Sequence, residues 1–349
     1  MRNLSSVHDK PIERRELLRA AGLSVGLAAS ATLPAWATDA KFTLRLSTWG
    51  APSVPQVAVY VPEFTKRVES GSQGRITVQH FPAGSLVKEQ DVASAIQARV
   101  VDISLSEIGT WASSVPTAAL LNTVLFSPSD AQFATMIGPG TKLYRALDAD
   151  LGKHGAVLLG TIDNGAPVVV SRQPITTPLD FRGKTVRVFD RLTSQIVQTL
   201  GGAPSTIQVS DVYPALERGT VQAAIGGLQG EAGLKVYEVA KFLLLTNGVV
   251  GTGTTFYVMN KASLAALPPD LQKLVVDSGE AAGRLANDAV VGALVKLRQV
   301  MEAHGMKVTD LQPGSPQYDA FVTALKPLAD QQRAKFSPAL VQDLTLGKG

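Results

Sequence analysis

A long stretch with helical periodicity, Pro268 to His304, constrains the fold of this chain more than any other feature. It contains no proline after Pro269, and Gly305 follows it, so both ends carry helix boundary signals. Its apolar residues at helical spacing are Leu271, Leu274, Val275, Ala281, Ala282, Leu285, Ala289, Leu297 and Val300. A continuous helix of about 35 residues would be roughly 50 Å long, more than one compact domain of this size. We therefore expect it to lie across two lobes, unless Gly279 and Gly283 bend it.

Alternating strands and helices precede this stretch. The first strand shows the pattern most clearly, because Phe42, Leu44 and Leu46 share one face. The predicted strands are residues 41–50, 74–81, 101–109, 154–163, 166–174, 184–190, 220–227 and 252–260. Helices are predicted over 53–74, 88–100, 191–201 and 210–219. This order predicts an α/β protein with parallel sheets covered by helices.

The N-terminus has the three-part pattern of an export signal. A charged start contains Arg14 and Arg15, and the apolar stretch of 14 residues that follows, Ala20 to Leu33, is too short to span a membrane. Small residues at Ala35 to Ala37 predict cleavage after residue 37. The arginine pair resembles a twin-arginine signal, but Glu13 stands where Ser or Thr is usual. A general secretory signal and an ordinary amphipathic first helix are the alternatives.

Composition excludes several classes of function. The 349 residues suffice for two domains, and the absence of cysteine excludes disulfides and thiolate chemistry. Residues 1–37 carry five basic and three acidic side chains, so only +2 of the total charge of +4 belongs to the rest of the chain. No basic run with interleaved aromatics remains there, which argues against nucleic-acid binding. No later apolar run is long enough to span a membrane, so we expect a soluble mature chain.

The residues that catalysis or cofactor binding requires are also missing. His80, His154 and His304 lie far apart, without metal-ligand spacing, and there is no nucleophile elbow or P-loop. The glycine-rich segment at residues 248–255 precedes a strand, whereas a dinucleotide site needs glycines that follow one. We interpret it as a crossing between lobes. The sequence predicts recognition without reaction: no enzyme, no cofactor and no metal.

Several segments together resemble one family. They are ESGSQGRITVQHFPAGSLVKEQDVASAIQARVVDISL (69–105), PITTPLDFRGKTVRV (174–188), LGGAPSTIQVSDVYPALERGTV (200–221), VYEVAKFLLLT (236–246) and LPPDLQKLV (267–275). In order and spacing they are similar to the solute-binding proteins of tripartite ATP-independent periplasmic (TRAP) transporters, of the DctP type. Each motif alone is weak, but the ordered set covers nearly the whole mature chain.

The resemblance implies a type II periplasmic-binding-protein-like fold with two α/β lobes and a long helix spanning both. Lobe one is expected at residues 40–164 and 253–292, and lobe two at 165–252 and 293–349. It further implies a periplasmic protein that closes on a small organic acid in the cleft. The closed form would deliver the acid to the subunits of a TRAP membrane permease, which an ion gradient drives.

Arg187 is the main candidate for binding the ligand. In the strand GKTVRVFD, Thr185, Arg187 and Phe189 share one face, and Arg187 lies near the carboxyl end, where open α/β sheets bind ligands. A guanidinium matches a carboxylate with two parallel hydrogen bonds. The resemblance implies that Arg187 binds the ligand carboxylate. The alternative is a structural ion pair with Asp180 or Asp190.

Other candidates lie at strand ends. Trp49 and Glu107 follow the first and third strands, at positions that face the cleft in relatives. Glu107 would accept hydrogen bonds from ligand hydroxyl or amino groups, or else be a helix N-terminal charge. Phe189, Phe256 and Trp49 would pack against ligand carbon, or else belong to the core. Trp111 is a further pocket candidate.

Two departures from the family bear on the ligand. Pro167 stands where many relatives have a second arginine, which disfavours a dicarboxylate held by two arginines. Gly226 stands where relatives often have a ligand-binding Asn, so we expect fewer polar contacts and a roomier pocket. The sequence thus predicts a receptor for a monocarboxylate with an apolar or hydroxylated body. A receptor of an ATP-driven importer or a periplasmic sensor is the alternative.

Overall fold

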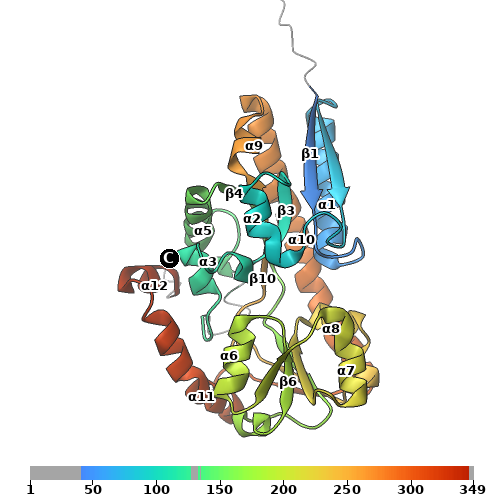
Figure 1. The fold of residues 1–349 in the computed structure, drawn as a ribbon, viewed down its shortest axis with the longest axis vertical. Coiled ribbons are helices and arrows are strands. Elements are labelled where there is room, and N and C mark those ends of the chain that lie inside the picture. Colours follow the sequence, from blue (N-terminus) through green and yellow to red (C-terminus); the bar gives the residue numbers. More distant parts are fainter. Residues whose placement is uncertain (1–40, 127–132, 134, 346–349) are drawn as a thin grey trace, which may run out of the picture. The chain divides into compact units, whose positions relative to one another are not determined.

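Two mixed β-sheets, each flanked by helices, form the part of the chain that the structure describes (Figure 1). The structure is a computed structural model, and it describes residues 41–126, 133 and 135–345. The predicted export signal and its cleavage site lie outside these residues. We call the sheets A and B and the lobes around them lobe one and lobe two.

Sheet A has the strand order β2-β1-β3-β10-β4. These strands are β2 (Ile76–Phe81), β1 (Phe42–Ser47), β3 (Ile103–Glu107), β10 (Thr254–Asn260) and β4 (Ala156–Asp163). β1 pairs in parallel with β2 and β3, whereas β10 is antiparallel to β3 and β4. The predicted alternation in the first strand is confirmed, since Leu44 and Leu46 are buried and Thr43 is exposed.

Sheet B has the order β11-β9-β5-β8-β6-β7. These strands are β11 (Lys307–Asp310), β9 (Phe242–Leu245), β5 (Val168–Ser171), β8 (Ala223–Gly226), β6 (Thr185–Val188) and β7 (Ala203–Thr206). β5 is antiparallel to β8 and β9, and the other pairs are parallel. The predicted parallel pairing is confirmed for β1, β2 and β3, whereas β5 and β10 run antiparallel to their neighbours. Each of these two strands follows a crossing between the lobes. It therefore begins at the end of the sheet where its neighbouring strands finish.

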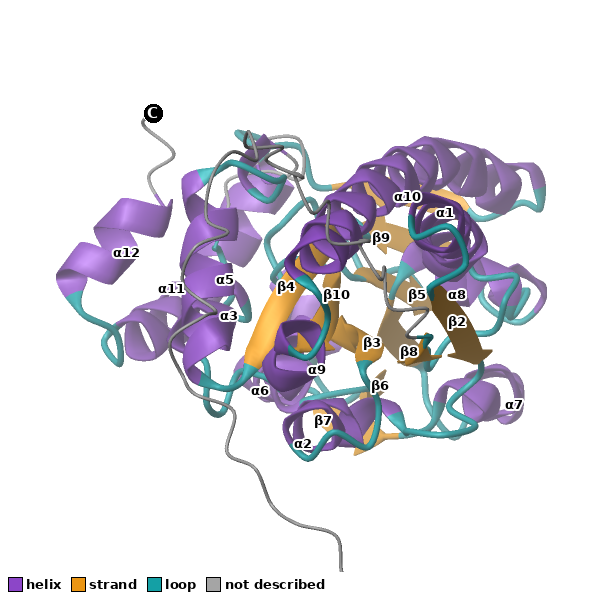
Figure 2. Cartoon of the chain, turned by 90° about the horizontal axis from the view of Figure 1, so that it is seen from above, coloured by secondary structure: helices purple, strands orange, loops and turns teal. Residues whose placement is uncertain are grey.

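Helices cover both sheets (Figure 2). Those of lobe one are α1 (Pro55–Gly71), η1 (Glu89–Asp91), α2 (Val92–Gln97), η2 (Ile108–Thr110), α3 (Pro116–Leu121), α5 (Lys142–Lys153) and α9 (Lys261–Ala265). Those around sheet B are η3 (Pro178–Phe181), α6 (Arg191–Thr199), η4 (Val209–Asp211), α7 (Val212–Arg218), α8 (Leu228–Gly233), η5 (Val236–Glu238) and α11 (Pro316–Arg333). α1 buries Val57, Val61, Phe64 and Val68, the residues whose spacing predicted this helix.

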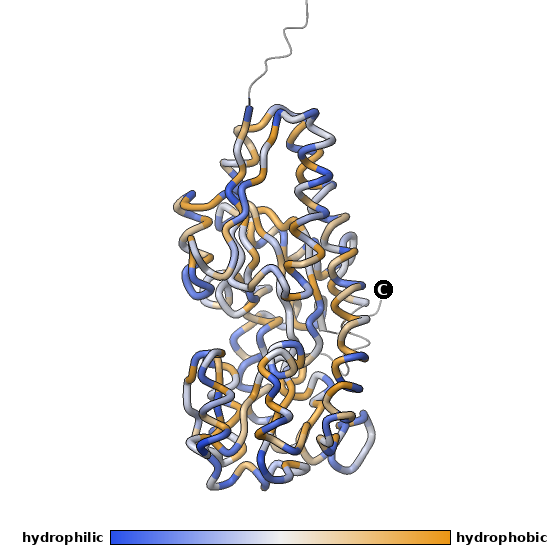
Figure 3. The backbone as a smooth tube through the Cα atoms, turned by 90° about the vertical axis from the view of Figure 1, so that its right-hand side faces the viewer, coloured by the Kyte–Doolittle hydropathy of each residue, from blue (hydrophilic) through white to orange (hydrophobic). Residues whose placement is uncertain are grey.

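The long helix α10 (Pro269–Ala303) is continuous and connects the two lobes (Figure 1). It packs on α1 and β4 in lobe one and on α8 in lobe two. Hydrophobic and hydrophilic residues alternate along it, as Figure 3 shows. The prediction of a continuous helix across both lobes is confirmed. Gly279 and Gly283 let the helix approach β4: a Cβ on Gly160 would lie 3.0 Å from the Cα of Gly283 and 3.1 Å from the carbonyl oxygen of Gly279.

Two connecting segments cross between the lobes side by side. Residues 164–167 lead from β4 to β5, and residues 246–253 lead from β9 to β10. The amide of Asn164 donates to the carbonyl of Gly253 at 2.8 Å. A Cβ on Gly253 would lie 2.1 Å from the carbonyl oxygen of Gly165, so the close approach requires glycine. The prediction that the glycine-rich segment crosses between lobes is confirmed.

The C-terminal residues return towards lobe one. α11 packs Phe321, Leu325 and Ala329 into a core cluster of lobe two. Beyond it, Phe336, Leu340 and Val341, the last two in α12 (Pro338–Thr345), pack on a core cluster of lobe one. The lobe boundaries given above stay a prediction. No helix in the described ranges is both long and apolar enough to cross a membrane.

Candidate ligand site between the lobes

Arg187 lies on β6, between the neighbouring strands β7 and β8. Its side chain is buried, with 3% exposure. Nε donates to the carbonyl of Ile207 at 3.0 Å, and Nη1 donates to the carbonyl of Ile225 at 2.9 Å. The ring centroid of Phe189, which is 45% exposed, lies 5.7 Å from Cζ. Two backbone carbonyls and one aromatic ring therefore hold the guanidinium at the carboxyl end of the strand.

Neither of the carboxylates predicted as alternative partners forms an ion pair with Arg187. Asp180 accepts hydrogen bonds from the amide and hydroxyl of Thr177 at 2.8 and 3.0 Å and closes the capping box of η3. Asp190 accepts from the amide of Thr193 at 2.8 Å and caps α6. Among the residues that the structure describes, no carboxylate is in ion-pair contact with Arg187. A buried cation without a contact anion is costly and favours binding of an anionic ligand.

The charges of three carboxylates act on Arg187 at longer range: Glu89 in η1, Asp190 before α6 and Glu231 in α8. The charges of Glu89 and Asp190 also act on a fourth carboxyl group, Glu107 at the end of β3. We call these four groups the acid cluster. Burial lowers the pKa of Arg187, whereas the charges on Glu231, Glu89 and Asp190 act in the opposite direction. Arginine stays protonated in spite of such shifts. Lobe one supplies two of the acids and lobe two supplies the other two, so the cluster lies where the lobes meet.

The two acids of lobe one affect each other. Burial raises the pKa of Glu107 well above its usual range, and the charges of Glu89 and Asp190 raise it further. Burial also raises the pKa of Glu89, where Asp190 adds to the effect and Arg187 opposes it. Glu107 precedes η2 but makes no capping hydrogen bond, so the structure gives no support to the alternative of a helix N-terminal charge. Both carboxylates are without a hydrogen-bond partner in the described part of the chain.

Glu231 occupies the space beside Gly226. A Cβ on Gly226 would lie 2.1 Å from Oε1 of Glu231, so only glycine leaves room for this carboxylate. Glu231 is 2% exposed, and its Oε2 has no hydrogen-bond partner among the described residues. Burial raises the pKa of Glu231 to about 7, although Arg187 acts against the shift. The expectation of a roomier pocket at Gly226 was therefore wrong, because the side chain of Glu231 fills that space.

The remaining candidates fall into two groups. Trp49 follows β1 and is partly exposed, and its buried Nε1 has no partner among the residues described. Trp111 and Phe256 are 0% exposed in the core cluster of lobe one, and Trp111 donates from Nε1 to Ser106 Oγ at 2.9 Å. The structure thus places Phe189 and the end of β8 at Gly226 beside Arg187, and Glu107 near Glu89 and Asp190. For Phe256 and Trp111 it favours a packing role.

The sequence analysis did not identify Glu89 or Glu231. Only their position gives a signal: Glu231 lies in α8, the helix that follows β8, and Glu89 begins η1, which precedes α2. Neither position reveals that the glutamate side chain is buried or that it lies near Arg187. Both features depend on the contact between the lobes and on the missing side chain of Gly226.

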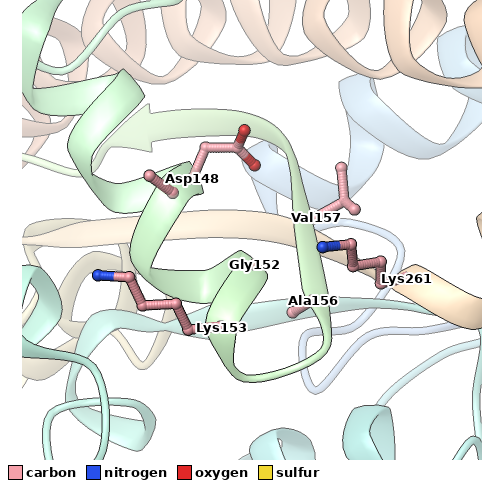
Figure 4. A pocket seen from close by; sticks show the side chains of 7 residues that line it. Asp148, Gly152, Lys153, Ala156, Val157 and Lys261 are labelled. Carbon is pink, nitrogen blue, oxygen red and sulfur yellow. The ribbon is translucent and has the colours of Figure 1, made fainter.

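A separate surface pocket lies on lobe one (Figure 4). It is lined by Asp148, Ala149, Gly152, Lys153, Ala156, Val157 and Lys261. Asp148 accepts from the amide of Leu158 at 2.9 Å, and Lys153 pairs with Asp150 at 2.7 Å. Asp148 and Lys153 thus have partners already, and the pocket includes no member of the acid cluster. Within the described ranges, no group of acidic or histidine side chains is arranged to hold a metal ion.

The sequence matches a known family over most of its length. The profile of the bacterial extracellular solute-binding proteins, family 7 (DctP), matches residues 47–335. A curated relative is the 2,3-diketo-L-gulonate-binding periplasmic protein of Escherichia coli K12. It is 27% identical over 253 residues, which cover 71% of this chain and 76% of that protein.

Solved structures share the fold. A TRAP periplasmic solute-binding protein from Sulfitobacter sp. NAS-14.1, crystallised with β-D-galacturonate, superimposes with a TM-score of 0.77 at 22% identity. The alignment covers 87% of this chain and 99% of that one. A TRAP solute-binding protein from Sulfurospirillum deleyianum, crystallised with succinate, gives 0.76 at 22% identity, over 88% and 100% of the two chains. These likenesses establish the two-lobed fold.

Proposed function

The chain belongs to family 7 of the bacterial extracellular solute-binding proteins, the DctP-type receptors of TRAP transporters, and from this premise we propose that it binds a small organic carboxylate between its lobes. Arg187 binds the carboxylate, and Glu107, Phe189 and the Gly226 region contact the rest of the ligand. The closed receptor delivers the ligand to the subunits of a TRAP membrane permease.

The observation that carries this proposal is the buried, unpaired guanidinium of Arg187. It is 3% exposed and is fixed by two backbone carbonyls, while no carboxylate of the described chain is in ion-pair contact with it. Fixed geometry reduces the entropy lost on binding, and the planar fork of arginine suits a carboxylate. The named ligands of the relatives reported above, galacturonate, succinate and diketogulonate, are compatible with an organic acid.

Closure of the lobes follows from the position of the site. Glu89 and Glu107 lie on lobe one, whereas Arg187 and Asp190 lie on lobe two. A ligand held by Arg187 gains contacts from lobe one only when the lobes approach. The ligand therefore binds the closed state more tightly than the open state. This difference in binding free energy shifts the protein towards the closed state.

DctP-family proteins are periplasmic receptors and not enzymes. We propose the same for this chain: export through residues 1–37, cleavage after Ala37, and a periplasmic location. Delivery to an ATP-driven importer or a sensor remains the alternative, and neighbouring permease genes would discriminate between them. Turnover of a bound acid by the purified protein would instead support an enzyme.

The first test is the loss of affinity on removal of Arg187. A thermal-shift screen of organic acids identifies a ligand, because a compound that binds only the folded state raises the melting temperature. Calorimetry of Arg187→Ala should then show a loss of about 2–5 kcal/mol, since one partner of a desolvated charge pair is gone. Arg182→Ala, an exposed arginine before the same strand, is the matched control. Wild-type affinity in Arg187→Ala would remove Arg187 from the site.

A further inference from the structure

We infer that Asn164 is a further ligand-binding residue: its Oδ1 accepts a hydrogen bond from a hydroxyl group on the acid whose carboxylate Arg187 binds. The inference rests on the proposed function and deepens it, because it makes the ligand a hydroxy acid. An apolar body and a hydroxylated body were both compatible with the sequence. Asn164 lies in the first of the two crossing segments, directly after β4.

The amide oxygen of Asn164 lacks a partner. Oδ1 is buried and has no hydrogen-bond partner among the described residues. Buried polar atoms are nearly always hydrogen-bonded, because an unpaired one has lost its water and gained nothing in return. A group that the ligand brings would supply the missing partner.

The rest of Asn164 is held in place. Its Nδ2 donates to Oγ1 of Thr255 at 3.1 Å, which fixes the orientation of the side-chain amide. Its backbone amide donates to the carbonyl of Gly253 at 2.8 Å, and its carbonyl accepts from Nε2 of Gln229 at 3.4 Å. Oδ1 is therefore a free acceptor on a side chain whose other polar groups are already used. Such an acceptor needs little ordering when a ligand binds.

Asn164 and Arg187 approach the end of β8 from opposite sides. Nη1 of Arg187, on β6, donates to the carbonyl of Ile225 at 2.9 Å, so the guanidinium lies against the end of β8. On its other side β8 pairs with β5, the strand into which the chain leads from Asn164. Gln229, in the helix that follows β8, reaches the carbonyl of Asn164. Neighbouring strands are about 4.8 Å apart, a sideways distance that a small organic acid spans.

Asn164 also borders a candidate of lobe one. Thr255, which accepts from Nδ2 of Asn164, is paired in register with Glu107 across β10 and β3. Asn164 thus lies between the strand that carries Glu107 in lobe one and the end of β8 in lobe two. A ligand whose carboxylate is bound by Arg187 meets this side chain where the lobes join.

A hydroxyl group is the donor that fits a neutral amide oxygen, since it donates a hydrogen bond without bringing a charge. An apolar body at this place would leave Oδ1 buried and unpaired in the complex as well. A second carboxylate, when ionised, has no hydrogen to donate. An ammonium group donates, but a buried charge needs an anionic partner, which Oδ1 is not.

The test compares acids that differ in one hydroxyl group. Calorimetry at pH 7 measures the wild-type protein with lactate and propanoate, with 2-, 3- and 4-hydroxybutanoate and butanoate, and with 6-hydroxyhexanoate and hexanoate. We expect at least one hydroxy acid to bind about tenfold tighter than its matched acid, because a hydrogen bond forms and a buried acceptor is no longer unpaired. The absence of such a preference in every pair, or tighter binding of alanine than of lactate, overturns the inference.

Two variants of Asn164 separate hydrogen bonding from packing. Asn164→Ala should reduce the preference for the hydroxy acid about tenfold, while the matched acid keeps its affinity because its carboxylate still meets Arg187. Asn164→Asp keeps an acceptor oxygen and should keep the preference, although both acids bind more weakly because the added negative charge repels their carboxylates. Preference retained in Asn164→Ala, or lost equally in both variants, contradicts a role for Oδ1 as acceptor.

Asn287→Ala is the matched structural control. Oδ1 of Asn287, on α10, accepts from the amide of Asp163 at 2.8 Å, the residue before Asn164. The substitution removes a hydrogen bond that supports the same crossing but leaves the amide of Asn164 unchanged, so the preference should persist. If it falls as far as in Asn164→Ala, Asn164 acts only by supporting the crossing, and its assignment to the ligand is wrong.

The two proposals fail separately. If hydroxy acid and matched acid bind equally well and both need Arg187, Asn164 has no ligand hydroxyl to bind and the carboxylate receptor stands. If the acids that bind the wild type bind Arg187→Ala with unchanged affinity, the proposed function itself fails.

Discussion

Glu231 shows how one missing side chain changes a binding site. Its carboxylate lies against Gly226, at the end of β8, and it is buried beside the buried guanidinium of Arg187. Burial raises the pKa of Glu231 to about 7 in spite of the nearby cation. A carboxyl group of this kind changes its charge near neutral pH, so its contribution to stability depends on pH.

We predict that Glu231→Gln flattens the pH dependence of stability. The pKa of Glu231 in the folded protein is about 7, against an ordinary value of 4.5. Below the ordinary value both states are protonated and burial carries no ionisation penalty. As pH rises from 4.5 to about 7, the unfolded chain ionises this group while the folded chain keeps it protonated, so the free energy of unfolding falls by about 3 kcal/mol.

Urea denaturation at pH 5 and pH 8 measures this effect. The difference between the two free energies of unfolding should be about 3 kcal/mol larger in the wild type than in Glu231→Gln. Glu217→Gln should behave as the wild type, because Glu217 is exposed. Equal pH dependences in wild type and Glu231→Gln would show that burial does not raise the pKa of Glu231 in the folded protein.

At the same scale, the sequence indicated Arg187 but not Glu231. Arg187 stands out because a charged residue interrupts an apolar strand near its carboxyl end, a local pattern. The role of Glu231 depends on the space beside Gly226 and on the fold of α8 against sheet B, which no local pattern encodes. Trp111 and Phe256 were predicted as pocket residues because of their type and neighbours, but the structure buries both in the core.

At the scale of elements, periodicity predicted the strands with strong patterns and missed three others. β7 contains Pro204 and is partly exposed at the edge of sheet B. β11 has four residues at the opposite edge, and β9 is a run of Phe and Leu that fits a buried helix equally well. Strand direction was also beyond local pattern, since β5 and β10 run antiparallel only because of where the chain crosses between lobes.

The glycines of α10 offer a matched pair of substitutions. A Cβ on Gly283 would lie 2.9 Å from the Cα of Gly160 on β4, and backbone atoms cannot move aside without separating helix and sheet. Gly283→Ala should therefore lower the free energy of unfolding by about 1–3 kcal/mol. Gly292, on the same helix, has nothing within 4 Å of its Cβ position. Gly292→Ala should raise stability by roughly 0.5–1 kcal/mol through helix propensity.

Chemical denaturation of both variants separates packing from propensity. If Gly283→Ala is stabilised like Gly292→Ala, the contact between α10 and β4 is looser than the structure indicates. Loss of stability in both would mean that α10 does not tolerate a side chain at either position, and the close approach at Gly160 would no longer explain the effect.

At the scale of the whole described chain, charge on the two lobes opposes their approach. Glu89 and Glu107 on lobe one face Arg187 and Asp190 on lobe two, and burial raises the pKa of both glutamates. When these acids are ionised, Glu107, Glu89 and Asp190 repel one another, and Arg187 opposes this effect at Glu89. Protonation of these acids should therefore favour the closed arrangement.

We predict that the ligand-free protein is more closed at pH 5 than at pH 8. The raised pKa values of Glu89 and Glu107 mean that the fraction protonated grows as pH falls through this interval, so the repulsion across the lobes weakens. Small-angle X-ray scattering should show a smaller radius of gyration at pH 5. Glu107→Gln should already be more compact at pH 8 and change less with pH, whereas Glu217→Gln should follow the wild type. The radius of gyration could instead be independent of pH and have the same value in Glu107→Gln. The acid cluster would then not control closure. Contacts along α10 and the two crossing segments would set the distance between the lobes instead.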